Sequence, residues 1–212
     1  MSGSAGPFTG LWQKNEGGGG SSAKTTLWEG GHREVGLAWW PGRIQPRVSN
    51  ATVSSLDYLP TFLALAGVPL PTDRVFDGMD ISHVLLEGSE TAHETLFHPN
   101  SGASGPDGQL DGVRWKNWKA IYQTGGAPDC SGNKGTVARH DPPLLFDLSA
   151  DPAESKALDT SVEPYKSVVT QIAQLLTAQM HSVNTTLRSV ANYNASKASE
   201  PCCNASTGCQ CN

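Results

Sequence analysis

A glycine-rich segment with one lysine is the first part of the chain whose residues could do chemistry. Residues 18–25 read GGGSSAKT, which approximates the phosphate-binding pattern G-x4-G-K-[ST]. Such a loop holds phosphates with backbone N–H groups and needs a strand before it and a helix after it. We predict neither element here, and Ala23 replaces the second glycine. Taken alone, Lys24 is most often a solvated side chain, so a binding role needs support from its surroundings.

Histidines are the next candidates, because they serve as metal ligands and as acid–base groups. No pair has the H-x3-H or H-E-x2-H spacing of a zinc site, and the H-x4-H spacing of His93 and His98 is a weak signal. We therefore interpret most of them as surface or hydrogen-bonded core residues. The six are His32, His83, His93, His98, His140 and His181.

Cysteines and glycosylation sequons indicate an oxidising compartment. Four cysteines gather in the last residues, a density typical of disulfide-linked secreted chains. A small zinc site is the alternative, although C-C-x5-C-x-C lacks the usual C-x2-C spacing, and three disulfide connectivities stay open. Cys130 is the fifth cysteine and is left over as an odd thiol. The four cysteines are Cys202, Cys203, Cys209 and Cys211, and the N-x-[ST] sequons begin at Asn50, Asn184, Asn194 and Asn204.

The N-terminus has neither a basic region nor an apolar run, so it does not look like a signal peptide. We therefore expect that the chain starts downstream of its natural beginning. A net charge of −5 gives no electrostatic reason to bind nucleic acid or an anionic membrane. No apolar stretch is long enough to span a bilayer. With 212 residues, the chain can bury a sizeable core.

Several elements must position these residues. We expect residues 1–33 to form a loop and Glu34–Trp40 to form a buried strand that ends at Pro41-Gly42. Ser54 or Ser55 should cap a helix that ends before Gly67, and the helix should start near Asp57 if Pro60 lies in its first turn. Four short segments predict an antiparallel sheet, and an apolar stripe predicts a helix that packs on it, capped by Ser161. The segments are Thr95–His98, Gly112–Trp115, Lys119–Gln123 and Leu144–Asp147, and the helix covers 161–181.

The run from Lys24 to Ile44, KTTLWEGGHREVGLAWWPGRI, resembles the second signature region of sulfatases, G-K-x-T-x-[YW]-E-G-G-x-R-x-P followed by W-P-G. Other family segments recur in order, and the tail is similar to that of the arylsulfatase A and G branch. The resemblance implies an α/β, alkaline-phosphatase-like fold seen in part. It implies that residues 1–92 form the C-terminal end of the large α/β domain and that residues 93–183 form a small sheet-and-helix domain. Residues 184–212 would form a glycosylated, cysteine-rich tail. The segments are DGMD at 77–80, LF at 96–97 and PPLLFDLSADPAE at 142–154.

The same resemblance implies roles for a few residues. Lys24 matches the lysine that contacts a sulfate oxygen, and Glu29 and Arg33 would hold its loop. Val35 departs from the usual proline. In relatives a cysteine just before the lysine pairs with one near position 130, so Cys130 should lack a partner here.

The family also requires a formylglycine nucleophile, made from Cys or Ser in C/S-x-P/S-x-R, and calcium bound by Asp-Asp and Asp-Asn pairs. None of these patterns occurs in the 212 residues. We therefore expect a C-terminal part of a lysosomal or secreted hydrolase of aryl or glycosaminoglycan-type sulfate esters, inactive alone and poorly soluble. The alternative is a non-catalytic secreted glycoprotein module.

Overall fold

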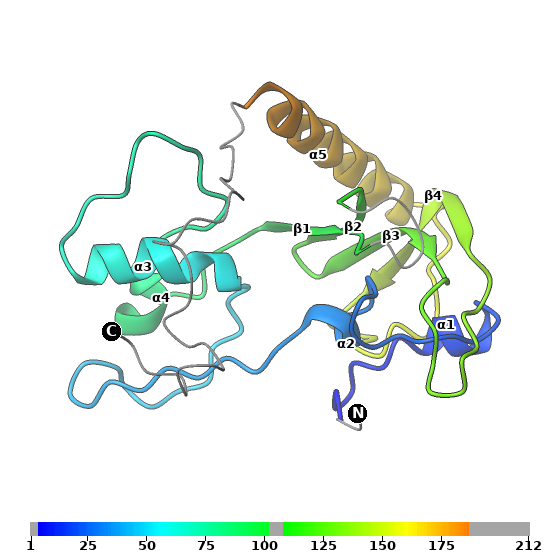
Figure 1. The fold of residues 1–212 in the computed structure, drawn as a ribbon, viewed down its shortest axis with the longest axis horizontal. Coiled ribbons are helices and arrows are strands. Elements are labelled where there is room, and N and C mark those ends of the chain that lie inside the picture. The colour runs from blue at the N-terminus through cyan, green and yellow to red at the C-terminus, as the bar shows by residue number, and fades with distance from the viewer. Residues whose placement is uncertain (1–3, 102–107, 187–212) are drawn as a thin grey trace, which may run out of the picture.

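A computed structural model describes residues 4–101 and 108–186, and its centre is a four-stranded antiparallel sheet (Figure 1). The strands are β1 (Thr95–Pro99), β2 (Leu110–Trp115), β3 (Trp118–Thr124) and β4 (Ala138–Asp147), in the spatial order β1-β2-β3-β4. The helices are α1 (Leu11–Asn15), α2 (Glu29–His32), α3 (Tyr58–Leu65), α4 (Ser82–Glu87) and α5 (Tyr165–Thr185), with a 3-10 turn at Ser55–Asp57. All four predicted strands are confirmed, and β4 begins six residues earlier than expected.

Local chemistry explains the tight β2–β3 hairpin. Trp115 pairs with Trp118, so only Lys116 and Asn117 form the loop. Lys116 has a φ of 56°, the left-handed conformation that two-residue hairpin loops require. Beyond the loop, Val113 lies opposite Ala120, and Ala120 lies opposite Leu145 on the next strand. Because side chains alternate along a strand, this register sets which residues share a face.

The sheet buries apolar side chains on both faces. Helix α5 covers one face, where Val168 and Ile172 pack against Val113, Ala120 and Leu145 (Figure 1). This confirms the predicted packing of the apolar stripe. The helix spans 165–185, and Pro164 occupies the N-cap position in place of the predicted Ser161. The Ser161 hydroxyl instead donates to Asp159 at 2.6 Å.

The N-terminal segment covers the opposite face, so the prediction that residues 1–33 form only loop is wrong. It contains the short helices α1 and α2. Leu27 and Trp28 are buried against Ile121 and Phe146, with the Trp28 ring 5.7 Å from that of Phe146. The proposed division at residue 92 stays a prediction, but packing between 27–28 and the sheet crosses it.

Glu34–Trp40 is the clearest departure from expectation. The structure assigns no strand there, and the side chains of Val35, Leu37 and Trp39 are 96%, 92% and 83% exposed. Within the described residues, no strand lies beside this segment to pair with its backbone. A strand needs such a neighbour for its hydrogen bonds, so the apolar pattern alone cannot form one.

The predicted helix near residue 57 is confirmed as α3, which lies with α4 apart from the sheet (Figure 1). Ser54 and Asp57 form a capping box, and Gly67 follows the helix with a φ of 68°. The Asp57 carboxylate is fully buried and accepts hydrogen bonds from the Met79 N–H at 2.9 Å and from His93 Nε2 at 2.7 Å. These bonds hold the connection to β1.

Candidate functional site

Lys24 lies on the surface of the loop that joins α1 to α2. Its side chain is 67% exposed and forms an ion pair with Glu34, which is 71% exposed. Exposed pairs of this kind are weak because solvent screens them. The ammonium group of Lys24 is therefore available to a stronger anion that approaches from solvent.

Hydrogen bonds fix the backbone on both sides of Lys24. The Ser22 hydroxyl donates to the Thr9 carbonyl at 2.5 Å, and the Thr26 hydroxyl donates to the Ala23 carbonyl at 2.7 Å. The hydroxyl of Ser101, two residues after β1, donates to the Thr25 carbonyl at 2.8 Å. Lys24 is thus an exposed side chain on a loop that hydrogen bonds hold on both sides.

Glu29, five residues after Lys24, is a buried centre of charge. Its carboxylate accepts hydrogen bonds from Lys119 Nζ at 2.9 Å, from His32 Nε2 at 3.2 Å and from Arg33 at 3.4 Å. Arg114 adds a positive charge 4.0 Å away. Burial opposes ionisation, but the hydrogen bond from His32 and the charge of Lys119 outweigh it and lower the pKa of Glu29. The geometry agrees with the structural role expected for Glu29 and Arg33.

Glu154 completes this cluster from the turn after β4. Its side chain is fully buried, with Oε1 3.2 Å from Lys119 Nζ and Oε2 accepting the Glu29 backbone N–H at 2.7 Å. Burial raises the pKa of Glu154, while Lys119 and the N–H bond act in the opposite direction. Lys119 and Glu154 lie 90 and 125 residues from Glu29, so sequence spacing gave no signal for them.

Two histidines that are far apart in the sequence meet beside the cluster. The rings of His32 and His98 stack with centroids 3.8 Å apart. Burial lowers the pKa of both, and the charge of Lys119 lowers each further. These shifts disfavour the charged form of both rings, which fits the interpretation as core histidines.

The glycine-rich segment is held by a buried glutamine. Gln13 Nε2 donates to the carbonyls of Gly17 at 3.0 Å and Gly19 at 2.7 Å, and its Oε1 accepts the Gly125 N–H at 3.0 Å. Helix α1 precedes the segment where a phosphate-binding loop needs a strand, and α2 begins only at Glu29. The phosphate-loop alternative is therefore wrong.

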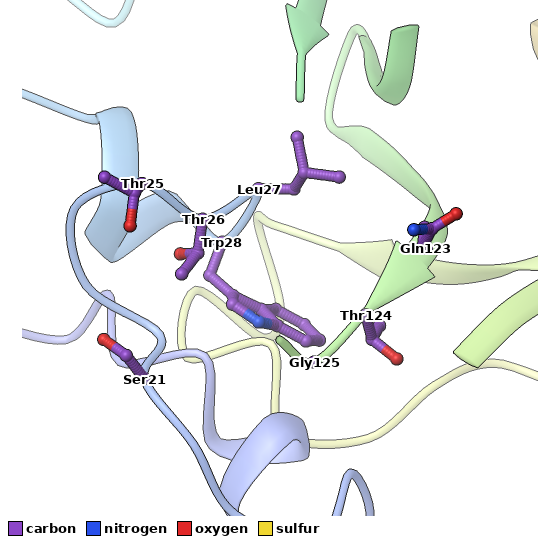
Figure 2. Close-up of a pocket in the computed structure, with 8 residues that line it drawn as sticks. All are labelled: Ser21, Thr25, Thr26, Leu27, Trp28, Gln123, Thr124 and Gly125. Atoms are coloured by element: carbon purple, nitrogen blue, oxygen red, sulfur yellow. The ribbon is translucent and has the colours of Figure 1, made fainter. Parts of the chain in front are cut away.

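A small hollow lies between this loop and the end of β3 (Figure 2). Hydroxyl and amide groups from both elements give it a polar character, while the Trp28 ring forms an apolar wall (Figure 2). Its lining residues are Ser21, Thr25, Thr26, Leu27, Trp28, Gln123, Thr124 and Gly125. The hollow adjoins Lys24 through Thr25.

The remaining predicted sites fall into two groups. Asn50 and Asn184 are both exposed, and Cys130 is an exposed free cysteine. Asn194, Asn204 and the four tail cysteines lie outside the described residues.

Across 4–101 and 108–186, no group of three or more His, Cys, Asp or Glu side chains could hold a metal ion, so this part of the chain does not fit a calcium site. No helix in the same ranges is long and apolar enough to cross a membrane.

Comparisons with known proteins agree with the sequence motifs. Residues 91–211 match the family described as the C-terminal region of aryl-sulfatase, and residues 9–68 match the sulfatase family. Arylsulfatase G of Canis lupus familiaris is 47% identical over 100% of this chain and 39% of its own length. Human arylsulfatase G is 44% identical over 100% and 40%, and human arylsulfatase A is 40% identical over 76% and 34%.

Solved structures show the same fold. A sulfatase from Pseudoalteromonas sp. superposes with a TM-score of 0.68 at 23% identity, covering 79% of this chain and 33% of its own. A protein of Bacteroides thetaiotaomicron, described with the metabolism of multiple glycosaminoglycans, has a TM-score of 0.53 at 26% identity, covering 67% and 28%.

The chain belongs to the sulfatase family and has part of its α/β, alkaline-phosphatase-like fold. Within that family it is similar to arylsulfatase G over its whole length and is related to arylsulfatase A. It spans about two fifths of the length of the arylsulfatase G sequences that it matches.

Proposed function

We propose that this chain supplies the sulfate-binding lysine and the C-terminal part of an arylsulfatase that hydrolyses sulfate esters. The observation that carries the proposal is the position of Lys24. It lies in the stretch that resembles the sulfatase signature, on a loop held by hydrogen bonds at Ser22 and Thr26, with its ammonium group at the surface.

The chemistry assigned to Lys24 is electrostatic. Its ammonium donates charge-assisted hydrogen bonds to a sulfate oxygen, and a contact that strengthens as charge develops during the reaction also assists turnover. Glu34 competes for the same ammonium, so a bound sulfate must displace this exposed partner.

The reactive groups would come from elsewhere in the enzyme. The 212 residues contain no Asp-Asp or Asp-Asn dipeptide and no C/S-x-P/S-x-R segment. We infer that the formylglycine nucleophile and the calcium ligands belong to parts of the protein outside this sequence. Bound calcium would stabilise negative charge on the sulfate. The isolated chain should therefore bind weakly and catalyse nothing.

Substrate and compartment follow from the same reasoning. The proposed substrates are aryl or glycosaminoglycan-type sulfate esters, in a lysosomal or secreted setting. The sequons at Asn50, Asn184, Asn194 and Asn204 support passage through the secretory pathway, as do the tail cysteines. Asn50 and Asn184 are exposed, as glycan attachment requires.

The test joins this chain to the N-terminal part of the canine relative, replacing the matching two fifths, and measures hydrolysis of an aryl sulfate. The chimaera should be active, and the chain alone should not be. Lys24→Ala should lower kcat/KM by about ten- to hundredfold, because a charge-assisted hydrogen bond is lost. Lys14→Ala, an exposed lysine in α1, is the matched control and should change little.

Three outcomes would contradict the proposal. Turnover by the chain alone would show that it carries its own nucleophile. A folded but inactive chimaera would favour the non-catalytic glycoprotein module. Equal effects of Lys24→Ala and Lys14→Ala would remove Lys24 from the site.

A further inference from the structure

The segment from the start of α1 to the start of α2, which includes the loop that carries Lys24, contacts one turn of the C-terminal half at both of its ends. At its beginning, the Ala153 carbonyl accepts the Leu11 N–H at 2.9 Å and the Glu154 carbonyl accepts the Trp12 N–H at 3.0 Å. At its end, the Glu154 carboxylate accepts the Glu29 N–H at 2.7 Å. Glu154 therefore contacts both flanks of the segment in which Lys24 lies.

Glu154 is itself held in place from several directions. Its backbone has a φ of 51°, and its N–H donates to the Asp151 carbonyl at 3.1 Å. Asp151 also accepts hydrogen bonds from the N–H and the hydroxyl of Ser155, at 2.8 and 2.9 Å. A non-glycine residue keeps a left-handed conformation only where its surroundings fix it. The turn is thus a rigid support.

Lys119 links this support to the sheet. It projects from β3 on the face that carries Ile121, two residues on, and its side chain is fully buried. Its Nζ lies 3.2 Å from Glu154 Oε1 and 2.9 Å from Glu29 Oε1. One ammonium thereby joins the sheet, the turn after β4 and the start of α2.

The residues that meet at this buried position, Glu29, Lys119 and Glu154, are all ionisable, and this suggests a need for fixed geometry. Apolar side chains of similar volume could fill this space without loss of stability, whereas hydrogen-bonded charges fix distances and directions. A lysine that must meet a sulfate oxygen needs its backbone fixed to well under an ångström. We propose that Glu154 and Lys119 are positioning residues, which set the place of Lys24 in the active site without touching substrate.

This inference rests on the proposed function, and a double-mutant cycle in the chimaera separates the two. Glu154→Gln should lower kcat/KM by about five- to thirtyfold. In the Lys24→Ala background it should cause less than a twofold further change, because the residue that it positions is gone. Glu87→Gln, an exposed glutamate in α4, is the matched control.

A second variant keeps the test decisive if Glu154→Gln fails to fold. Lys119→Met combined with Glu154→Gln removes one charge of each sign, so it preserves the buried charge balance while it removes the ion pairs of Lys119 with Glu29 and Glu154. It should melt close to the parent protein and show the same dependence on Lys24.

Each outcome has a separate meaning. If the loss of kcat/KM in Glu154→Gln/Lys24→Ala equals the product of the two single losses, the positioning role is overturned, and Lys24 remains the proposed sulfate ligand. An unchanged kcat/KM in folded Lys119→Met/Glu154→Gln would also overturn it. An inactive parent chimaera would count against the proposed function itself.

Discussion

Replacing Lys119 by methionine removes the ammonium that lies between the buried carboxylates of Glu29 and Glu154. At 2.9 and 3.2 Å, each attraction is about 5 kcal/mol at an effective dielectric constant near 20, before desolvation is subtracted. Removal of one partner from a buried ion pair typically costs about 3–5 kcal/mol. Glu29 keeps His32, Arg33 and Arg114, so we expect the lower value, about 3 kcal/mol at pH 7.5. For a chain of this size, the melting temperature should fall by about 6–12 °C.

Urea unfolding followed by tryptophan fluorescence measures this loss directly. Trp28, which precedes Glu29 in the sequence, is 2% exposed and packs against Ile121 and Phe146, so its emission should report the transition. Lys156→Met, at an exposed lysine, is the control and should stay within about 0.5 kcal/mol. The loss for Lys119→Met should shrink towards pH 5, because the raised pKa of Glu154 lets that carboxyl take up a proton.

The companion variant Lys119→Met/Glu154→Gln should recover most of the lost stability, since it leaves no unpaired carboxylate beside methionine. A loss below about 1 kcal/mol for Lys119→Met at pH 7.5 would refute the reasoning. The reasoning would also be refuted if Lys119→Met/Glu154→Gln were less stable than Lys119→Met. That result would mean that the Glu154 carboxylate does not destabilise the protein when Lys119 is absent.

Three further predictions concern pH, packing and solubility. Burial lowers the pKa of His32 and His98, so the unfolded chain binds protons that the folded chain excludes. The free energy of unfolding should therefore decrease as the pH drops below about 6.5. The decrease should be up to about 1.4 kcal/mol per pH unit for each histidine. Urea titrations of His98→Gln should show a shallower slope, and an unchanged slope would contradict the role of that ring. Ile172→Ala, at a fully buried position in α5, should cost about 2–5 kcal/mol, against well under 1 kcal/mol for the half-exposed Val183→Ala, as measured by thermal unfolding. Leu37→Lys should reduce self-association in light scattering without a change in melting temperature, because this side chain is 92% exposed; a large loss of stability would mean that it is buried.

The strands and the long helix were predictable because their signals are local. Ile121 and Ala120 alternate between the two faces of β3, and Val168 and Ile172 repeat at helical spacing in α5. The helix after Ser54 followed from its capping residues and from Gly67. In each case the side chains that determine the element lie within a few residues of it.

Glu34–Trp40 shows where local pattern fails. Its residues have the composition of a buried strand, but a strand is a property of two segments that share hydrogen bonds. Without a neighbouring strand in the described chain, the same residues run exposed. The start of α5 differed from its prediction for a smaller reason, because the Ser161 hydroxyl donates to Asp159 and does not cap the helix.

For the candidate site, the sequence alone determined the family and the absence of the nucleophile pattern, and it indicated Lys24 as the candidate lysine, because each is a matter of residue type and short spacing. Only the tertiary structure placed Glu154 and Lys119 beside Glu29. Lys119 lies 90 residues from Glu29 and Glu154 lies 125 residues from it, and no sequence periodicity records contacts of this kind, which are made only by folding. The contacts on both sides of the segment that carries Lys24 are therefore decided by packing of the N-terminal segment on the C-terminal sheet.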